Sequence, residues 1–307
     1  MTFQTPDRQA LLQRLDPPSG PVDVVLDTDT YNEIDDQFAV VYALLSDNLN
    51  LEAIYAAPFY NNRSSGPADG MQRSYDEIMR LLERLGRTDE PVYHGSDRYL
   101  GSADTPVRSE AAEDLIARAM QPRDGPLYVA TIGAITNVAS ALLLEPAIAE
   151  RIAIVWLGGN PLYWPHTREF NLRQDVPAAR VVFDCGVAVV QIPCMSVAQL
   201  LLTTLPEMFH YVKGRGEIGD YLYRIYEDFS ADHYARSKVI WDISAIGWLN
   251  HPDWVPTEIV PSPVLLDDAT WGPVDPARHP IRTATTVHRD RVFGDLFAKL
   301  DAAARAG

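Results

Sequence analysis

Short apolar segments alternate with amphipathic ones along most of the chain, and this alternation predicts its secondary structure. β-Branched apolar segments indicate strands at residues 22–26, 51–57, 127–131, 152–157, 188–192 and 283–287. Between them, apolar residues recur every three or four positions and predict helices at residues 35–46, 71–85, 110–120, 137–144 and 176–184. Gly86 and Gly186 follow two of these helices as stop signals. The pattern predicts an α/β fold with an open, mostly parallel sheet flanked by helices.

Nothing in the pattern divides the chain into parts. It contains no internal repeat, no low-complexity tract and no long Pro- or Gly-rich linker, and the Pro-rich stretch 252–280 is interpreted as an ordered surface excursion. With 47% hydrophobic and 22% charged residues, the 307-residue chain has the composition of a globular protein with a sizeable core. We expect residues 1–307 to form a single domain with its core at about 22–300.

The net charge limits the classes of binding partner, and the cysteine content indicates the cellular compartment. The net charge of −16 argues against nucleic acid and anionic membranes, which attract basic surfaces. Cys185 and Cys194 lie in apolar surroundings, which favours buried free thiols in a reducing cytosol over a disulfide. No signal-peptide pattern opens the chain and no apolar run reaches transmembrane length. We expect a cytoplasmic protein.

An acidic cluster follows the first predicted strand directly. Asp27, Asp29, Glu33, Asp35 and Asp36 fall within ten residues, where a helix is predicted to begin. Like charges this close raise one another's pKa unless a cation or a substrate compensates them. Ca²⁺ and Mg²⁺ prefer carboxylate oxygens as ligands, so the cluster predicts a site for a hard divalent metal. A solvated acidic loop is the alternative.

Polar, amide-rich segments follow the other predicted strands, at residues 58–62, 132–137, 158–160 and 169–171. Ligands of an open α/β sheet bind outside the carboxyl ends of its strands, so we expect these segments to meet the acidic cluster there. Acidic groups and amides together suit a neutral polyhydroxyl ligand held by a metal. A phosphate site would instead favour Lys, Arg or a Gly-rich nest.

Five motifs, in the same order along the chain, resemble those of one enzyme family. The segment 27–36 is similar to a DxDxxxDD signature, residues 133–137 to a GPLTN turn and residues 157–159 to MGG. Residues 169–171 form an EFN element, and Asp175 with Ala178-Ala179 is similar to a DPxAA helix start. From about Val22 to the final helix, the chain resembles the nucleoside hydrolases of the inosine–uridine-preferring superfamily, which cleave the N-glycosidic bond of ribonucleosides.

The resemblance implies a calcium site and a hydrolytic mechanism. Asp29, Asp36, Asp242 and the backbone carbonyl of Ile132 would ligate one Ca²⁺, and Asp29 would accept the proton of the attacking water. The products would be free base and ribose, and an anionic pocket would stabilise an oxocarbenium-like transition state. The resemblance also suggests a homodimer or homotetramer.

The same resemblance implies which residues hold the nucleoside. Asp35 and Asn171 would hydrogen-bond ribose hydroxyls, and Glu169 would lie near the 5′-hydroxyl. Further sugar contacts would come from Asn61 or Asn62 and from Asn160.

The chain departs from the family pattern within the signature. Residues 31–34 lengthen it by two positions before Asp35 and Asp36, so the loop must bulge or extend there. Either aspartate could then be the metal ligand, and the role of Glu33 stays open.

A second departure concerns the leaving group. Trp241 precedes Asp242, where many family members have a His that protonates the base. A purine-specific branch of the family stacks an aromatic ring on the base instead, and Trp241 resembles that arrangement, which implies a purine preference; such stacking contributes on the order of 1–3 kcal/mol. A plain core Trp is the alternative. Among the histidines, His233 is the first candidate to fold over the pocket.

Two other function classes stay open. Residues 26–30 fit the strand-end pattern of haloacid dehalogenase-type phosphatases, in which Asp27 would be the nucleophile and Asp29 the acid/base, with Mg²⁺. Such a site needs a Lys, and Lys213 and Lys238 lie far from any predicted strand end. The other class is a non-catalytic homologue that binds nucleosides or sugars, although every metal-type Asp is present.

Overall fold

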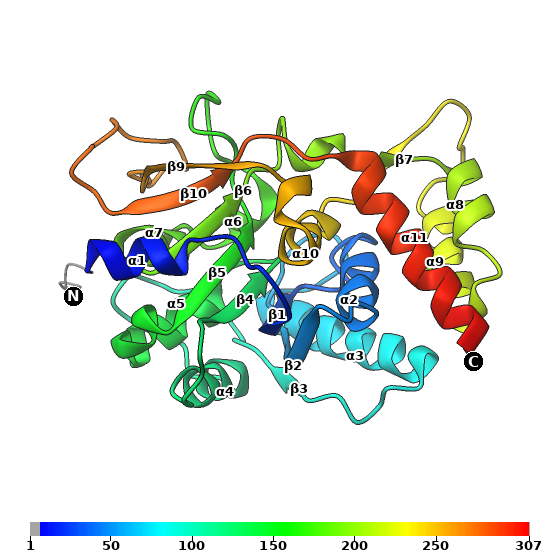
Figure 1. The fold of residues 1–307 in the computed structure, drawn as a ribbon, viewed down its shortest axis with the longest axis horizontal. Coiled ribbons are helices and arrows are strands. Elements are labelled where there is room, and N and C mark those ends of the chain that lie inside the picture. The colour runs from blue at the N-terminus through cyan, green and yellow to red at the C-terminus, as the bar shows by residue number, and fades with distance from the viewer. Residues whose placement is uncertain (1–6, 307) are drawn as a thin grey trace.

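The chain folds around one mostly parallel sheet of eight strands, and the computed structural model describes residues 7–306 (Figure 1). In spatial order the strands are β3 (Val92–His94), β2 (Leu49–Ala56), β1 (Val22–Thr28), β4 (Leu127–Thr131), β5 (Ile152–Leu157), β6 (Ala188–Ile192), β10 (Pro280–Ala284) and β9 (Thr257–Pro261). Neighbouring strands pair in parallel except β9, which runs antiparallel to β10. The chain runs outward from β1 to β2 and β3, and then returns to form β4 on the other side of β1. This reversal creates a switch point between β1 and β4, the kind of place where α/β sheets bind ligands.

Helices cover both faces of the sheet. One face carries α4 (Glu110–Ala119), α5 (Thr136–Leu144) and α7 (Val176–Asp184). The other carries α1 (Arg8–Arg14), α2 (Asp36–Leu44), α3 (Pro67–Leu85), α10 (Ile243–Asn250) and α11 (Arg289–Ala306), with α8 (Leu205–Tyr211) and α9 (Gly216–Asp228) beside α11 (Figure 1). The short helix α6 (Phe170–Gln174) precedes α7, and β7 (Leu202–Thr203) pairs with β8 (Lys238–Val239) in a second sheet. Within residues 7–306, 3₁₀ turns span Pro146–Glu150, Ala198–Leu200 and Pro252–Trp254.

The continuous apolar strands have a direct structural reason. Successive side chains of a strand point to opposite faces, and here each face has its own hydrophobic core. In β1, Val24 and Leu26 enter one core while Val25 enters the other, and all three are fully buried. Both faces therefore require apolar residues, and no polar alternation marks these strands.

The hydrophobic pattern predicts the central elements with the bounds that the structure has. This is the case for β4, β5, β6 and α7, and Gly86 ends α3 with φ of +64°, in the left-handed region that glycine favours. The open parallel sheet is confirmed. Cys185 and Cys194 are buried and free. No helix among residues 7–306 combines the length and apolar character that crossing a membrane requires.

The prediction is wrong at the sheet edge. The last predicted strand, 283–287, is β10 at Pro280–Ala284, because Val287 packs into the core from a loop and mimics a strand position. The stretch 252–280, interpreted as a surface excursion, contains strand β9. Glu258 and Ile259 of β9 are exposed, as is usual at an edge, so the strand has a weak apolar pattern.

Asp175 ties α7 to two other segments. Its carboxylate accepts hydrogen bonds from the Ala178 amide at 3.1 Å, from Thr136 Oγ1 at 2.7 Å and from the Leu100 amide at 2.9 Å. The side chain is buried, so its removal would leave these donors without partners.

We predict that Asp175→Ala lowers the free energy of unfolding by about 2–4 kcal/mol, because it removes a helix cap and leaves buried donors unpaired. Urea titration measures the change. The matched control is Asp7→Ala, which removes the exposed cap of α1 and should cost about 1 kcal/mol or less. Equal losses in the two variants would contradict a tying role for Asp175.

Candidate active site

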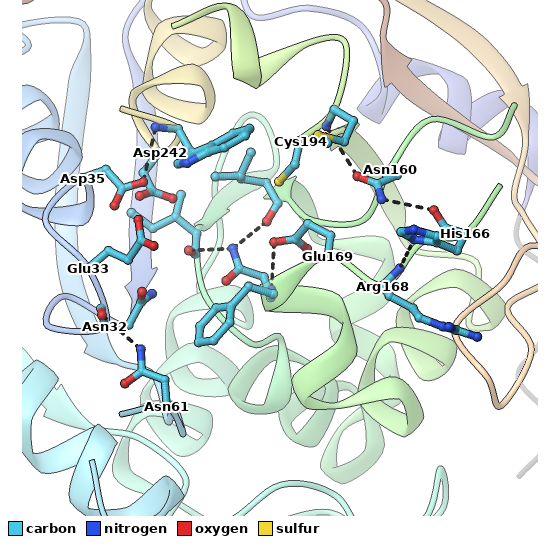
Figure 2. A pocket seen from close by; sticks show the side chains of 16 residues that line it. Asn32, Glu33, Asp35, Asn61, Asn160, His166, Arg168, Glu169, Cys194 and Asp242 are labelled. Atoms are coloured by element: carbon cyan, nitrogen blue, oxygen red, sulfur yellow. Dashed lines mark hydrogen bonds between the residues drawn. The ribbon is translucent and has the colours of Figure 1, made fainter. Parts of the chain in front are cut away.

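A cavity of about 360 Å³ lies at the carboxyl ends of the central strands (Figure 2). Segments that follow β1, β2, β4, β5 and β6 meet there with the residues just before α10, as the strand order requires. The lining residues are Asn32, Glu33, Asp35, Asn61, Ile132, Leu157, Asn160, His166, Arg168, Glu169, Phe170, Asn171, Cys194, Met195, Trp241 and Asp242. Figure 2 shows Asp35, Asp242 and Glu33 on one side and Asn160, His166 and Arg168 on the other.

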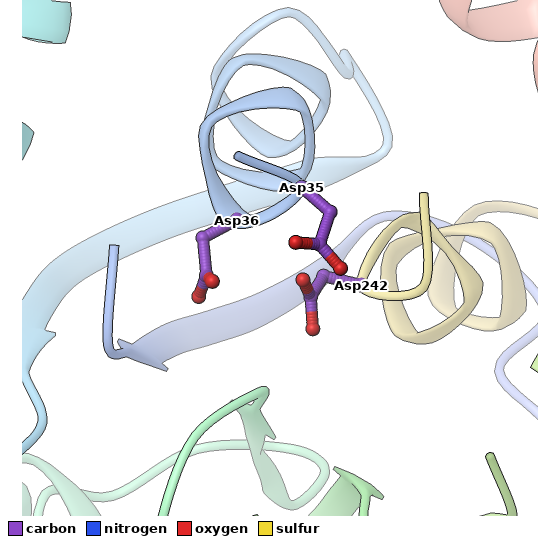
Figure 3. A group of neighbouring side chains, drawn as sticks. All are labelled: Asp35, Asp36 and Asp242. Atoms are coloured by element: carbon purple, nitrogen blue, oxygen red, sulfur yellow. The ribbon is translucent and has the colours of Figure 1, made fainter. Parts of the chain in front are cut away.

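Three carboxylates converge at one end of this cavity. Asp35, Asp36 and Asp242 each offer an oxygen within 4.8 Å of the others, and all three residues are buried (Figure 3). Asp35 and Asp36 lie at the start of α2, and Asp242 directly precedes α10. Two helix starts, about 200 residues apart in the sequence, therefore bring like charges together.

Asp29 lies beside this three-carboxylate group, one residue beyond the end of β1. Both of its carboxylate oxygens are buried, and neither has a partner at hydrogen-bond geometry among the described residues, although the nearby Asn32 side chain partly offsets the rise that burial causes in its pKa. Gly133, in the loop after β4, makes room for it: a Cβ at Gly133 would lie 3.0 Å from Asp29 Cγ. A buried carboxylate without donors requires another source of positive charge.

The pKa values of these carboxyl groups reflect the same lack of nearby positive charge. Burial raises the pKa of Asp29 and Asp242 well above the ordinary carboxyl range, and the neighbouring Asp36 raises both further. Burial, followed by the charge of Asp35, raises the pKa of Asp36 to about 8, although Thr28 Oγ1 donates a hydrogen bond to it at 2.6 Å. This group offers only oxygen atoms and lacks compensating positive charge, so it fits a hard divalent cation.

Backbone carbonyls and one amide form the floor next to this group. Asn171 Nδ2 donates to the carbonyl of Ile132 at 2.9 Å and to that of Leu157 at 3.0 Å. The Ile132 carbonyl, an expected metal ligand, thus already accepts one hydrogen bond at the cavity wall. The two contacts fix the amide of Asn171, a lining residue, and no hydrogen bond among residues 7–306 uses its Oδ1.

Glu169 lines the cavity but serves largely as a helix cap. Its carboxylate accepts hydrogen bonds from the amides of Gly159 at 2.8 Å, Asn171 at 2.8 Å and Leu172 at 3.1 Å. Burial raises the pKa of Glu169, and these amides partly offset the effect. Asn160 lines the same side and donates through Nδ2 to the carbonyl of His166 at 3.1 Å.

Not every expected contact reaches the cavity. Asn61 lines it and donates through Nδ2 to the Asn32 carbonyl at 3.0 Å. Asn62 is exposed and is not part of the lining. His233 also lies outside it: the ring stacks on Tyr226, and Nε2 is 2.8 Å from the Glu227 carbonyl.

Trp241 lines the cavity, is half-buried and packs on the core. Its exposure is intermediate between that expected of a ring that stacks on a base and that of a plain core residue. Its backbone amide donates to Asp35 Oδ2 at 3.3 Å. The segment before α10 therefore orients a carboxylate as well as presenting an indole ring.

Lys238 corrects an expectation from the sequence. It was expected to lie far from the strand ends, yet its Nζ is 2.5 Å from Glu33 Oε2 and 3.7 Å from Asp35 Oδ1. The error arose because Lys238 lies in β8, a two-residue strand of the second sheet that the hydrophobic pattern does not predict. Cys194, Met195, His166 and Arg168 of the lining were also missed. Ligands of an open α/β sheet bind outside the carboxyl ends of its strands. Applied to the segment after β6, this rule would have indicated Cys194 and Met195.

The surroundings of Asp27 argue against the phosphatase alternative. Thr131 Oγ1 donates to Asp27 Oδ2 at 3.0 Å, and Asn137 Nδ2 donates to Oδ1 at 2.7 Å. Asp27 is fully buried, and burial raises its pKa to about 7. A nucleophile needs an oxygen that is free to attack, whereas both oxygens of this side chain accept hydrogen bonds that join β1 to β4 and α5.

Comparisons with known proteins agree with this geometry. The family model described as inosine-uridine preferring nucleoside hydrolase matches residues 24–294. The pyrimidine-specific ribonucleoside hydrolase RihA of Escherichia coli is 28% identical over 191 residues, which cover 54% of this chain and 58% of that protein. The chain thus spans less than two thirds of the length of this curated relative.

Two solved structures show the same fold. The purine-preferring ribonucleoside hydrolase from Gardnerella vaginalis has a TM-score of 0.75 at 22% identity, over 93% of this chain and 100% of that one. The type III effector protein XopQ, complexed with adenosine diphosphate ribose, has a TM-score of 0.69 at 16% identity, over 98% and 99%. The family match extends over most of the chain, and the protein belongs to the inosine-uridine preferring nucleoside hydrolase family.

Proposed function

We propose that the protein hydrolyses the N-glycosidic bond of ribonucleosides to free base and ribose. The observation that carries the proposal is the buried Asp29 carboxylate, which lacks hydrogen-bond partners among the described residues and lies beside Asp35, Asp36 and Asp242. Such a concentration of negative charge suits a cation and a transition state with positive charge on the sugar. Membership of the family supports the same reaction.

We infer that Ca²⁺ is the cation, since the groups around Asp29 are hard oxygens. Asp29, Asp36, Asp242 and the Ile132 carbonyl would hold it, and when bound it would acidify a water and contact the ribose hydroxyls. Asp35 is assigned to the sugar because it lines the cavity, whereas Asp36 lies behind the lining and is oriented by Thr28.

The residues of the chain then have separate tasks. Asp29 would accept the proton of the attacking water. Asp35 and Asn171 Oδ1 would accept hydrogen bonds from ribose hydroxyls, while Asn160 and Glu169 would face the 5′-hydroxyl across the cavity. The combined negative charge would stabilise the oxocarbenium-like sugar as the bond to the base breaks.

Trp241 would stack on the leaving base, which supports a preference for purines because they offer the larger π face. The printed names of the relatives differ in this respect: RihA is pyrimidine-specific and the Gardnerella enzyme is purine-preferring. For this chain the base preference therefore rests on Trp241 and not on its relatives.

Incubation with the common ribonucleosides in the presence of calcium should release reducing sugar, and purine nucleosides should react faster than pyrimidine nucleosides. A reducing-sugar assay measures the rates. If no ribonucleoside releases ribose, the catalytic proposal is wrong and a binding function is favoured. Release of inorganic phosphate from phosphoesters would instead support the phosphatase alternative.

Substitutions at two positions separate base catalysis from stacking. Asp29→Ala should reduce kcat by about 10²–10⁴-fold or more, because it removes the general base and a metal ligand. Trp241→Phe keeps an aromatic face and should be mild, whereas Trp241→Ala should reduce kcat/KM about 5- to 150-fold. Exposed Asp268→Ala is the control. Equal losses in the two Trp241 variants would argue against stacking.

Calcium should stabilise the protein against heat. A ligand at about 100 times its Kd adds about 2.7 kcal/mol to the free energy of unfolding, so the Tm should rise by several degrees after chelated protein is reloaded. The rise should disappear in Asp36→Asn, whose metal-free Tm should not fall, because one buried like charge is removed. An unchanged Tm in the wild-type protein would contradict a calcium site.

A further inference from the structure

The two-residue insertion in the signature forms part of the cavity wall. The chain turns sharply after Asp29, whose carbonyl accepts hydrogen bonds from the amides of Tyr31 at 2.6 Å and Asn32 at 2.9 Å. Asn32 and Glu33 then line the cavity next to Asp35 (Figure 2). The insertion therefore brings another carboxylate to a wall that is already acidic.

One ammonium group holds this added carboxylate. Lys238 Nζ lies 2.5 Å from Glu33 Oε2 and 3.7 Å from Asp35 Oδ1, and it also donates to the Val239 carbonyl at 3.0 Å. The Lys238 side chain is 12% exposed, whereas that of Glu33 is 45% exposed. Hydrogen bonds among residues 7–306 use Oε2 of Glu33 and leave Oε1 free to accept one from the cavity.

Contacts other than the Glu33 side chain hold the inserted loop in place. Arg63 Nη1 donates to the carbonyls of Glu33 at 2.9 Å and Tyr31 at 3.3 Å. The Tyr31 ring lies 5.7 Å from the guanidinium carbon of Arg63 and 5.9 Å from those of Arg73 and Arg80. Truncation of Glu33 should therefore leave the loop in position.

We propose that Glu33 is a specificity-determining residue and that Lys238 positions it. Glu33 Oε1 accepts a hydrogen bond from an O–H or N–H donor of the bound nucleoside, next to the group that Asp35 holds. This inference rests on the proposed function of the cavity. The donor is a ribose hydroxyl or an N–H on the edge of the base, since both offer the same chemistry to a carboxylate.

Two physical arguments support this assignment. A carboxylate that is ion-paired to a buried ammonium is already ordered, so it loses little conformational freedom when a substrate binds. A hydrogen bond to a charged acceptor is roughly twice as strong as one between neutral groups. Lys238 also lies 3.7 Å from Asp35 Oδ1, so one ammonium group orders both acceptors on the same side of the cavity.

The test compares Glu33→Ala with the wild-type protein on the best ribonucleoside substrate and on three analogues. These are its 2′-deoxy form, its 3′-deoxy form and a form whose base lacks the N–H donor, with slow analogues measured as competitive inhibitors. On the parent nucleoside, Glu33→Ala should raise KM or Ki roughly tenfold or more. On the analogue that lacks the donor, the substitution should have little further effect, which identifies the sugar or the base as the source.

Variants of Lys238 test its positioning role. Lys238→Met should reproduce the increase in KM, Lys238→Arg should restore most of the wild-type value, and the combined loss in the double variant with Glu33→Ala should be less than the sum of the two single losses. Glu258→Ala, an exposed glutamate on β9, is the matched control and should leave the kinetics unchanged.

The outcomes are distinct. An unchanged KM in Glu33→Ala, or equal losses on the parent and on every analogue, would overturn the role of Glu33 while the wild-type hydrolysis of ribonucleosides still stands. A wild-type protein that releases no ribose from any nucleoside would overturn the proposed function itself, and this inference with it.

Discussion

The structure depends on holding four carboxylates together away from water. Asp29, Asp35, Asp36 and Asp242 are buried, and burial together with mutual repulsion raises the pKa of Asp29, Asp36 and Asp242. This arrangement costs folding free energy that the surrounding structure must offset. Two hydrophobic cores, one on each face of the sheet, supply the rigid support, and a bound cation would supply the missing positive charge.

The strand order explains why these groups meet at all. β1 lies between β2 and β4, so the acidic loop after β1 faces the Gly133 loop after β4 at the switch point. Asp27 stabilises this junction, because Thr131 Oγ1 and Asn137 Nδ2 each donate a hydrogen bond to one of its two carboxylate oxygens. The two aspartates at the end of β1 thus have different roles: Asp27 joins the strands, and Asp29 has no hydrogen-bond donor among residues 7–306.

Much of this arrangement could be predicted from the sequence, for identifiable reasons. Strands buried on both faces leave long apolar runs, and parallel order places the loops after β1, β4 and β5 at one edge, where Asp35, Asn160 and Asn171 line the same cavity. Contacts that depend on side-chain direction or on distant irregular segments could not be predicted. Lys238 reaches the acidic loop from a two-residue strand, and Asn62 points to solvent although its neighbour Asn61 lines the cavity.

Gly133 has a consequence for how sequence can vary in relatives of this chain. A Cβ there would press on the Asp29 carboxyl group, with Cγ 3.0 Å and Oδ1 3.1 Å away, and on the Ala57 Cβ at 3.2 Å. Replacement of the glycine therefore forces either the loop or the carboxylate to move. The absence of a side chain at one position and the presence of a carboxylate at another are a single steric unit, so a substitution at either position changes the space available to the other.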